Sequence, residues 1–142
     1  MFKPFILLIT LIANVTFAQL KLDIKTIQGE WFASKTIIDP KVGLIKLARV
    51  KPNDLGHGTF LSIKDTDNFT LYYSPMCGND CIWNYGGKYS FKANKLTFKF
   101  ETYTQHGFCK SVSKSYKNNQ IQFTFLVEAK GKDTLVLKRQ KK

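Results

Sequence analysis

The chain has 142 residues, the length of one domain, and it contains no internal repeat or low-complexity linker, which excludes a multidomain or repeat architecture. Its 22 basic and 10 acidic residues give a formal net charge of +12. The lysines alternate along the predicted strands and do not cluster, which favours a solvated basic face over a dedicated polyanion site. A polyanion of the cell envelope stays open as an alternative partner.

Residues 1–18 are typical of a secretory signal. A short basic start precedes an apolar run at residues 5–13, and Thr16 and Ala18 are small residues at the −3 and −1 positions of a signal-peptidase site. The apolar run falls short of the roughly 20 residues that span a bilayer. We therefore expect a single mature domain at residues 19–142, without a transmembrane segment, in the periplasm or outside the cell. Export argues against a nucleic-acid partner.

Short runs with apolar residues at alternate positions follow one another at about ten-residue spacing. The clearest run places Leu96, Phe98 and Phe100 on one face of a strand. A meander of this kind closes into a barrel and so leaves no unpaired edge, which predicts an all-β, antiparallel, up-and-down barrel of eight or nine strands, with an open sandwich as the alternative. The expected strands are residues 30–38, 44–50, 59–64, 69–73, 88–92, 95–103, 108–116, 121–127 and 134–138, and residues 138–142 end in a frayed basic tail.

Three short motifs give the chain a family resemblance. Gly29-Glu30-Trp31 opens the first strand, Cys77-Gly78 opens a loop, and Gly86-Gly87-Lys88-Tyr89 leads into an aromatic strand. In these motifs the chain resembles the small secreted bacterial lipocalin-like (calycin-type) domains. The resemblance implies an antiparallel barrel with Trp31 pointing inward near the closed end and a small apolar ligand in the cup.

Strand alternation indicates which side chains share the inner face of such a barrel. A barrel of about eight strands either encloses one small ligand or is filled by its own side chains. We predict that it binds a small hydrophobic or amphipathic molecule and needs no cofactor. The predicted lining consists of Trp31, Leu61, Ile63, Phe69, Leu71, Tyr89, Phe91, Phe98, Phe100, Phe123 and Phe125.

An up-and-down order makes successive loops alternate between the two ends of the barrel. It assigns to one end the loops at 39–43, 65–67, 93–94 and 117–119, and to the other the loops at 52–58, 74–87, 104–108 and 129–132 together with the start of the first strand. The second set holds both histidines, Cys77 and Cys81, and its loop at 104–108 leads directly into Cys109.

Three cysteines in an exported chain predict one disulfide and one remaining thiol. Cys109 returns beside the loop that holds the other two cysteines, which favours Cys81–Cys109, with Cys77–Cys109 as the alternative. A Cys77–Cys81 bond would close only a tiny ring. We expect a monomer, and the remaining thiol offers a route to a disulfide-linked dimer.

The residues that carry chemistry are sparse. His57, His106 and an unpaired cysteine provide ligand types suited to zinc or haem iron, but no His-x-x-His or Cys-x-x-Cys pair accompanies them, so we predict no metal. No Gly-x-Ser-x-Gly elbow is present either, and we expect no enzyme. The alternative function is an interaction or inhibitor protein that presents a disulfide-tied loop at 74–87 on a solid barrel scaffold.

Overall fold

The computed structural model describes residues 21–54, 56–116 and 121–141, so the predicted signal peptide and the predicted turn at 117–119 lie outside the described residues. None of the helices in these ranges is long and apolar enough to cross a membrane. The elements are α1 (Ile24–Ile27), β1 (Gly29–Ala33), β2 (Leu44–Arg49), β3 (Gly58–Ile63), β4 (Asn68–Ser74), β5 (Cys81–Lys92), β6 (Lys95–Gly107), β7 (Val112–Ser115), β8 (Ile121–Ala129) and β9 (Thr134–Arg139).

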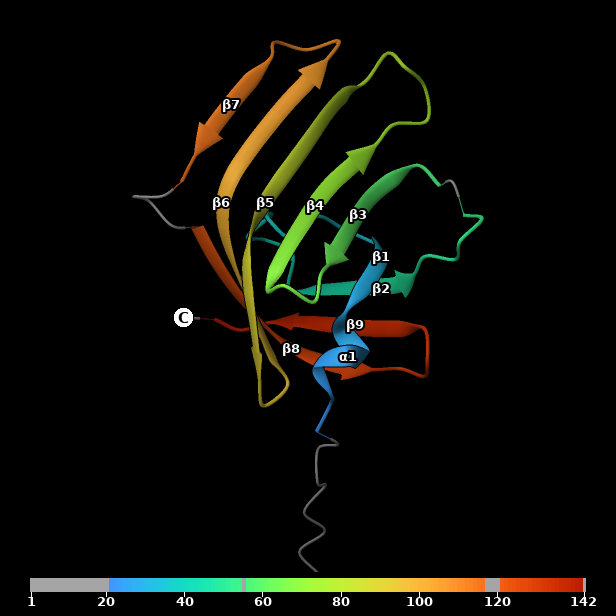
Figure 1. Cartoon of the computed structure of the whole chain (residues 1–142), viewed down its shortest axis with the longest axis vertical. Coiled ribbons are helices and arrows are strands. Elements are labelled where there is room, and N and C mark those ends of the chain that lie inside the picture. Colours follow the sequence, from blue (N-terminus) through green and yellow to red (C-terminus); the bar gives the residue numbers. More distant parts are fainter. Residues whose placement is uncertain (1–20, 55, 117–120, 142) are drawn as a thin grey trace, which may run out of the picture.

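Eight of these strands close into an antiparallel barrel in the order β1–β3–β4–β5–β6–β8–β9–β2, with β2 pairing back to β1 (Figure 1). The extra strand, β7, pairs with residues 102–105 of β6, whereas β8 pairs with residues 95–100 of the same strand. The predicted all-β antiparallel barrel is therefore confirmed.

Strand β1 breaks the simple alternation of the loops because it lies between β2 and β3. Both neighbours run antiparallel to it, so the chain between β2 and β3 returns from one end of the barrel to the other, and Val50, Asp54 and Gly56 lie with Phe32 on the outside of β1. There Gly56 lies against the ring of Phe60, and Gly58 lies against the ring of Phe32.

This return path corrects the predicted placement of the loops. The α1 end of the barrel carries α1, the start of β1, and the turns at 64–67, 93–94 and 130–133 (Figure 1). The disulfide end carries the loops at 34–43, 75–80 and 108–111. The prediction was wrong for the loops at 39–43 and 129–132, and β1 starts at the end opposite the cysteines.

Strands β5 and β6 are much longer than predicted. Residues 81–87, which we expected in the loop at 74–87, pair with β4 on one side and with β6 on the other. The register between β5 and β6 shifts by one residue at this point: Gly86 pairs with Thr102 and Gly87 pairs with Phe100. Glu101 is thus the extra residue of a β-bulge on β6. A Cβ atom on Gly87 would lie 2.0 Å from the carbonyl oxygen of Lys99, so the strands approach this closely only with glycine there. Conversely, the predicted strand at 108–116 shortens to β7.

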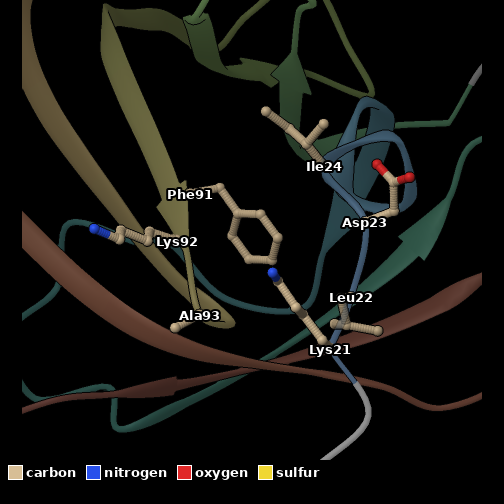
Figure 2. Close-up of a pocket in the computed structure, with 7 residues that line it drawn as sticks. All are labelled: Lys21, Leu22, Asp23, Ile24, Phe91, Lys92 and Ala93. Atoms are coloured by element: carbon tan, nitrogen blue, oxygen red, sulfur yellow. The ribbon is translucent and has the colours of Figure 1, made fainter.

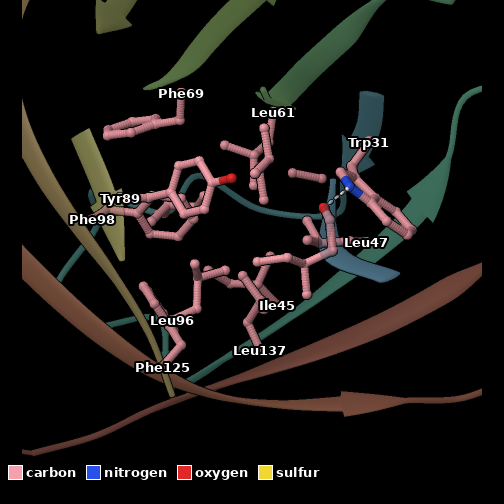
Figure 3. Close-up of a cluster of buried hydrophobic side chains, with 14 of the residues drawn as sticks. Trp31, Ile45, Leu47, Leu61, Phe69, Tyr89, Leu96, Phe98, Phe125 and Leu137 are labelled. Carbon is pink, nitrogen blue, oxygen red and sulfur yellow. Dashed lines mark hydrogen bonds between the residues drawn. The ribbon is translucent and has the colours of Figure 1, made fainter. Parts of the chain in front are cut away.

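The barrel is filled by its own side chains (Figure 3). Of the predicted lining, nine residues are buried, while Phe91 and Phe123 are only partly buried. Trp31, Leu61, Leu71, Phe98, Phe100 and Phe125 have 0% exposed area, which leaves no water-sized gap beside them. Phe69 packs edge-on against Phe98 and Phe100, with ring centroids 4.8 and 5.0 Å away. A ligand at the barrel centre stays a prediction, and it requires these rings to move.

The Gly-x-Trp motif closes the α1 end. The indole N–H of Trp31 donates a 2.8 Å hydrogen bond to the carbonyl of Ile27, drawn as a dashed line in Figure 3. The guanidinium of Arg49 lies 4.1 Å from the Trp31 ring centroid and donates to the carbonyls of Thr26 and Gln28. Together these contacts fasten α1 over the end of the barrel.

We expect Gly29→Ala to lower the free energy of unfolding by about 1–3 kcal/mol. Gly29 has a φ of +125°, and a Cβ atom there would lie 2.5 Å from Nη1 of Arg49. Urea denaturation followed by circular dichroism measures the loss. Gly43→Ala is the matched control, because no atom lies within 4 Å of a Cβ built at Gly43. Equal stability of the two variants would contradict this explanation of the motif.

Candidate functional site

A row of partly buried aromatic rings covers the core at the disulfide end. We call it the aromatic floor, and it consists of Tyr73, Trp83, Tyr85, Tyr103 and Phe123. The Tyr73 and Trp83 rings stack at 6.0 Å, and Trp83 meets Tyr85 edge-on at 5.6 Å. Tyr85 lies 4.5 Å from Tyr103, and both Tyr85 and Phe123 pack on Phe100 of the core, at 5.8 and 5.9 Å. The rings thus form one continuous surface from β4 to β8.

The register of the strands places these rings on the inner face. Tyr85 pairs with the buried Leu71 on one side and with Tyr103 on the other. Since alternate residues of a strand point to opposite faces, Trp83 shares the inner face with Tyr85. The bulge at Glu101 matters here, because the extra residue brings Tyr103 rather than Thr102 to the inner face.

The floor is apolar but offers neutral hydroxyl groups. Burial, together with smaller effects of the nearby Tyr103 and Tyr116, raises the pKa of Tyr85 to about 12. The hydroxyl of Tyr103 donates to the side-chain carbonyl of Gln105. The Tyr85 phenol therefore stays protonated at neutral pH and acts as a hydrogen-bond donor beside flat apolar rings.

Arg139 stands at the β8–β9 side of the floor. Its guanidinium lies 4.3 Å from the ring centroid of Phe123. It donates hydrogen bonds to the carbonyls of Ile37, Asp39 and Val42, which holds the loop at 34–43 over the end of the barrel. Burial lowers the pKa of Arg139, although a guanidinium keeps its charge in proteins. Arg139 is therefore an ordered part of β9, and the predicted frayed tail at 138–142 was wrong at this position.

One guanidinium nitrogen of Arg139 has no acceptor. Its Nη1 atom is buried and makes no hydrogen bond within the part of the chain that the structure describes. A cavity of about 620 Å³ adjoins this side chain, lined by Pro40, Gln122, Phe123, Thr124, Arg139, Gln140 and Lys141. Two cations and no carboxylate are among these lining residues, so the cavity is suited to an anion with an apolar part.

A second cavity, of about 600 Å³, lies at the α1 end (Figure 2). Its walls are the segment before α1 and the β5–β6 hairpin, which are joined by a 2.8 Å hydrogen bond from the Leu22 N–H to Oδ1 of Asn94. Phe91, a predicted lining residue, lies between these walls in Figure 2, with the side chains of Lys21 and Lys92 nearby. Here the charged groups are the exposed side chains of Lys21, Asp23 and Lys92, and no buried donor without a partner marks this cavity among the described residues.

Comparison with known protein families identifies the family of this chain. Residues 27–125 match the profile of the lipocalin-like domain family. The chain belongs to this family. Neither a characterised protein nor a solved structure matches it significantly. In this lipocalin-like domain the matched segment includes Gly29, Trp31 and the whole aromatic floor, whereas Arg139 lies beyond it.

The cysteines of the lipocalin-like domain pair as predicted. Cys81 and Cys109 form the disulfide and join the start of β5 to the loop at 108–111, while Cys77 is a free, exposed thiol. The alternative pairing of Cys77 with Cys109 is excluded.

The histidines do not assemble a site. His57 lies exposed in the segment before β3, and His106 lies exposed on β6. The described residues contain no group of three or more His, Cys, Asp or Glu side chains that would hold a metal ion. The alternative metal site of His57, His106 and a cysteine is thus not formed in this part of the chain.

Sequence reasoning missed Arg139, Tyr85, Tyr103 and Trp83 as site residues. The sequence did contain a signal that could have singled out Arg139: of its 22 basic residues, only Arg49 and Arg139 are arginines. Both guanidinium groups stack on aromatic rings and donate to backbone carbonyls, which an ammonium group does less well. Trp83 and Tyr85 of the floor were missed because the Gly86-Gly87 pair is typical of a loop, and we therefore predicted a loop at 74–87 where the structure has strand β5.

Proposed function

We propose that this lipocalin-like domain binds a small amphipathic molecule at the disulfide end, with its apolar body on the aromatic floor and an anionic group at Arg139. Arg139 carries the proposal, because it lines the 620 Å³ cavity and its buried Nη1 atom makes no hydrogen bond among the described residues. A buried donor without an acceptor costs about 1–3 kcal/mol, and an anionic oxygen supplies a charge-assisted hydrogen bond.

The rest of the site supports the same ligand class. Binding sites for small molecules combine apolar and aromatic walls with a few placed polar groups. The floor offers flat rings for stacking, and the Tyr85 hydroxyl offers a hydrogen-bond donor. Because the core below is solid, the ligand rests on the floor and does not enter the centre of the barrel.

The proposed setting is the periplasm or the extracellular space. A disulfide between Cys81 and Cys109 is typical of an oxidising compartment. The signal sequence predicted at residues 1–18 agrees with this setting. The proposed role is that of a non-enzymatic, monomeric binding protein without a cofactor.

Two fluorescent probes test the proposal: the aromatic sulfonate 1-anilinonaphthalene-8-sulfonate and the uncharged N-phenyl-1-naphthylamine. We expect Arg139→Gln to weaken binding of the sulfonate by about tenfold or more, because a hydrogen bond to a charged group is lost. Binding of the uncharged probe should change by less than about twofold, since it makes no ion pair. Fluorescence titration of both probes measures the difference.

Lys92→Gln in the cavity at the α1 end is the control, and we expect it to leave the affinity of both probes unchanged. Equal weakening of both probes by Arg139→Gln would show that Arg139 acts only by holding the loop at 34–43. A larger effect of Lys92→Gln on the sulfonate would move the site to the α1 end. Either result overturns the proposal.

A further inference from the structure

We infer that the tips of the two disulfide-linked loops, 75–80 and 108–111, form a docking surface for an anionic lipid bilayer. The predicted interaction loop at 74–87 narrows in the structure to residues 75–80, and the loop at 108–111 lies beside it at the same end of the barrel (Figure 1). This surface is separate from the aromatic floor and from Arg139.

The tips carry the two most exposed large apolar side chains of the described residues. Met76 is 70% exposed and Phe108 is 76% exposed. The other exposed large apolar side chains, Ile24, Phe32 and Leu44, reach only 41–45%. Single exposed apolar residues are ordinary, but two strongly exposed ones on loops joined at a disulfide favour an interaction surface at this end.

The tips are held in place before any partner arrives. The Cys81–Cys109 bond ties the loops, and the Phe108 N–H donates to the carbonyl of Asp80 at 3.5 Å. Gly107 allows this contact, since it has a φ of +101° and a Cβ atom there would lie 2.7 Å from that same carbonyl oxygen. Phe108 is therefore presented outward by a constrained backbone, which lowers the entropy lost on docking.

The charge around the tips favours an anionic partner. Lys110 is exposed two residues after Phe108, and Lys114 is exposed on β7, the strand that follows this loop. Asp80, the acidic residue of the two loops, accepts a 3.1 Å hydrogen bond from the Tyr73 hydroxyl. The formal net charge of the whole chain is +12, and without Lys3 of the predicted signal the mature domain keeps +11, which adds attraction to an anionic surface. Lysines near an anionic leaflet strengthen binding, and salt screens that attraction.

The small apolar area decides between a bilayer and a protein partner. A stable protein interface buries roughly 800 Å² on each partner, with an apolar core ringed by polar residues. Two protruding side chains with Lys110 in the second loop do not provide such a core, but they fit insertion of apolar side chains among lipid head groups. Docking in this way turns the disulfide end, and with it the aromatic floor, toward the lipid.

Sedimentation with lipid vesicles tests the inference on the whole mature domain. We expect it to co-sediment with phosphatidylcholine vesicles that contain about 30% phosphatidylglycerol, and to do so less as salt is raised. Pure phosphatidylcholine should retain little protein. Met76→Ser/Phe108→Ser should lower the partition coefficient by at least about tenfold, because the inserted apolar area is lost. Ile24→Ser, at the α1 end, is the control and should change it by less than about twofold.

Cys77 supplies a direct readout, because it is the free, exposed thiol beside Met76. An environment-sensitive nitrobenzoxadiazole label on Cys77 should shift to shorter wavelength when anionic vesicles are added. The inference is overturned if the wild-type domain does not sediment with anionic vesicles, if it sediments equally with both lipid compositions, or if the tip variant and the control behave alike. Each of these outcomes leaves the probe titration at Arg139 unaffected.

Discussion

Replacing Trp31 with alanine is expected to lower the free energy of unfolding by about 3–5 kcal/mol, the range for deleting a large buried aromatic side chain. The Trp31 ring has 0% exposed area, its indole N–H is bonded to Ile27, and the guanidinium of Arg49 covers its face. The substitution removes all three contacts and leaves a cavity. Urea denaturation followed by far-ultraviolet circular dichroism measures the change.

Trp83→Ala is the matched control at the other end of the barrel. Trp83 is only partly buried and stacks on Tyr73 in the aromatic floor. Its removal should lower the free energy of unfolding by about 1–2 kcal/mol, since roughly half of an aromatic side chain's burial is lost. The same variant should weaken binding of the sulfonate probe, which Trp31→Ala should not do while folded. A larger loss of stability from Trp83→Ala than from Trp31→Ala would contradict a solid core sealed at the α1 end.

The second large effect is expected from the disulfide. Cys81→Ser/Cys109→Ser should lower the free energy of unfolding by about 2–4 kcal/mol, because the bond restricts the unfolded chain. It links residues 28 positions apart, from the start of β5 to the loop after β6. The midpoint of urea denaturation of the double variant, compared with the oxidised wild type, measures this loss.

Cys77→Ser is the control, because Cys77 is exposed and unbonded. It should change the free energy of unfolding by no more than about 0.5 kcal/mol, the usual range for surface substitutions. If the double variant were as stable as the control, the disulfide would not be what stabilises the loops at 75–80 and 108–111.

The fold was largely predictable from the sequence because its main signal is local. The alternation of Leu96, Phe98 and Phe100 directly reflects one buried face, and all three side chains have 0% exposed area. Gly29 and Trp31 identified the closed end for a physical reason, since the glycine leaves room for Arg49 over the tryptophan. The Cys81–Cys109 pairing followed from two loops lying side by side.

What the sequence did not reveal depends on long-range pairing. The Gly86-Gly87 pair is typical of a loop, yet β5 continues through it because β4 and β6 pair with it on both sides. The position of β1 between β2 and β3 is likewise absent from any local pattern, and it moved two loops to the opposite ends. Arg139 resembles its basic neighbours in sequence, and only the packing of β9 against β8 brings it over Phe123.

The measurement that tests the central claim most directly is a two-dimensional ¹H–¹⁵N spectrum recorded while 1-anilinonaphthalene-8-sulfonate is added. The domain has two tryptophans, Trp31 in the solid core and Trp83 on the aromatic floor, so each end of the barrel has its own indole N–H signal. We predict that the Trp83 signal shifts with the probe while the Trp31 signal stays in place. A shift of the Trp31 signal, or a Trp83 signal that does not respond to bound probe, would contradict a ligand site on the aromatic floor above a filled barrel.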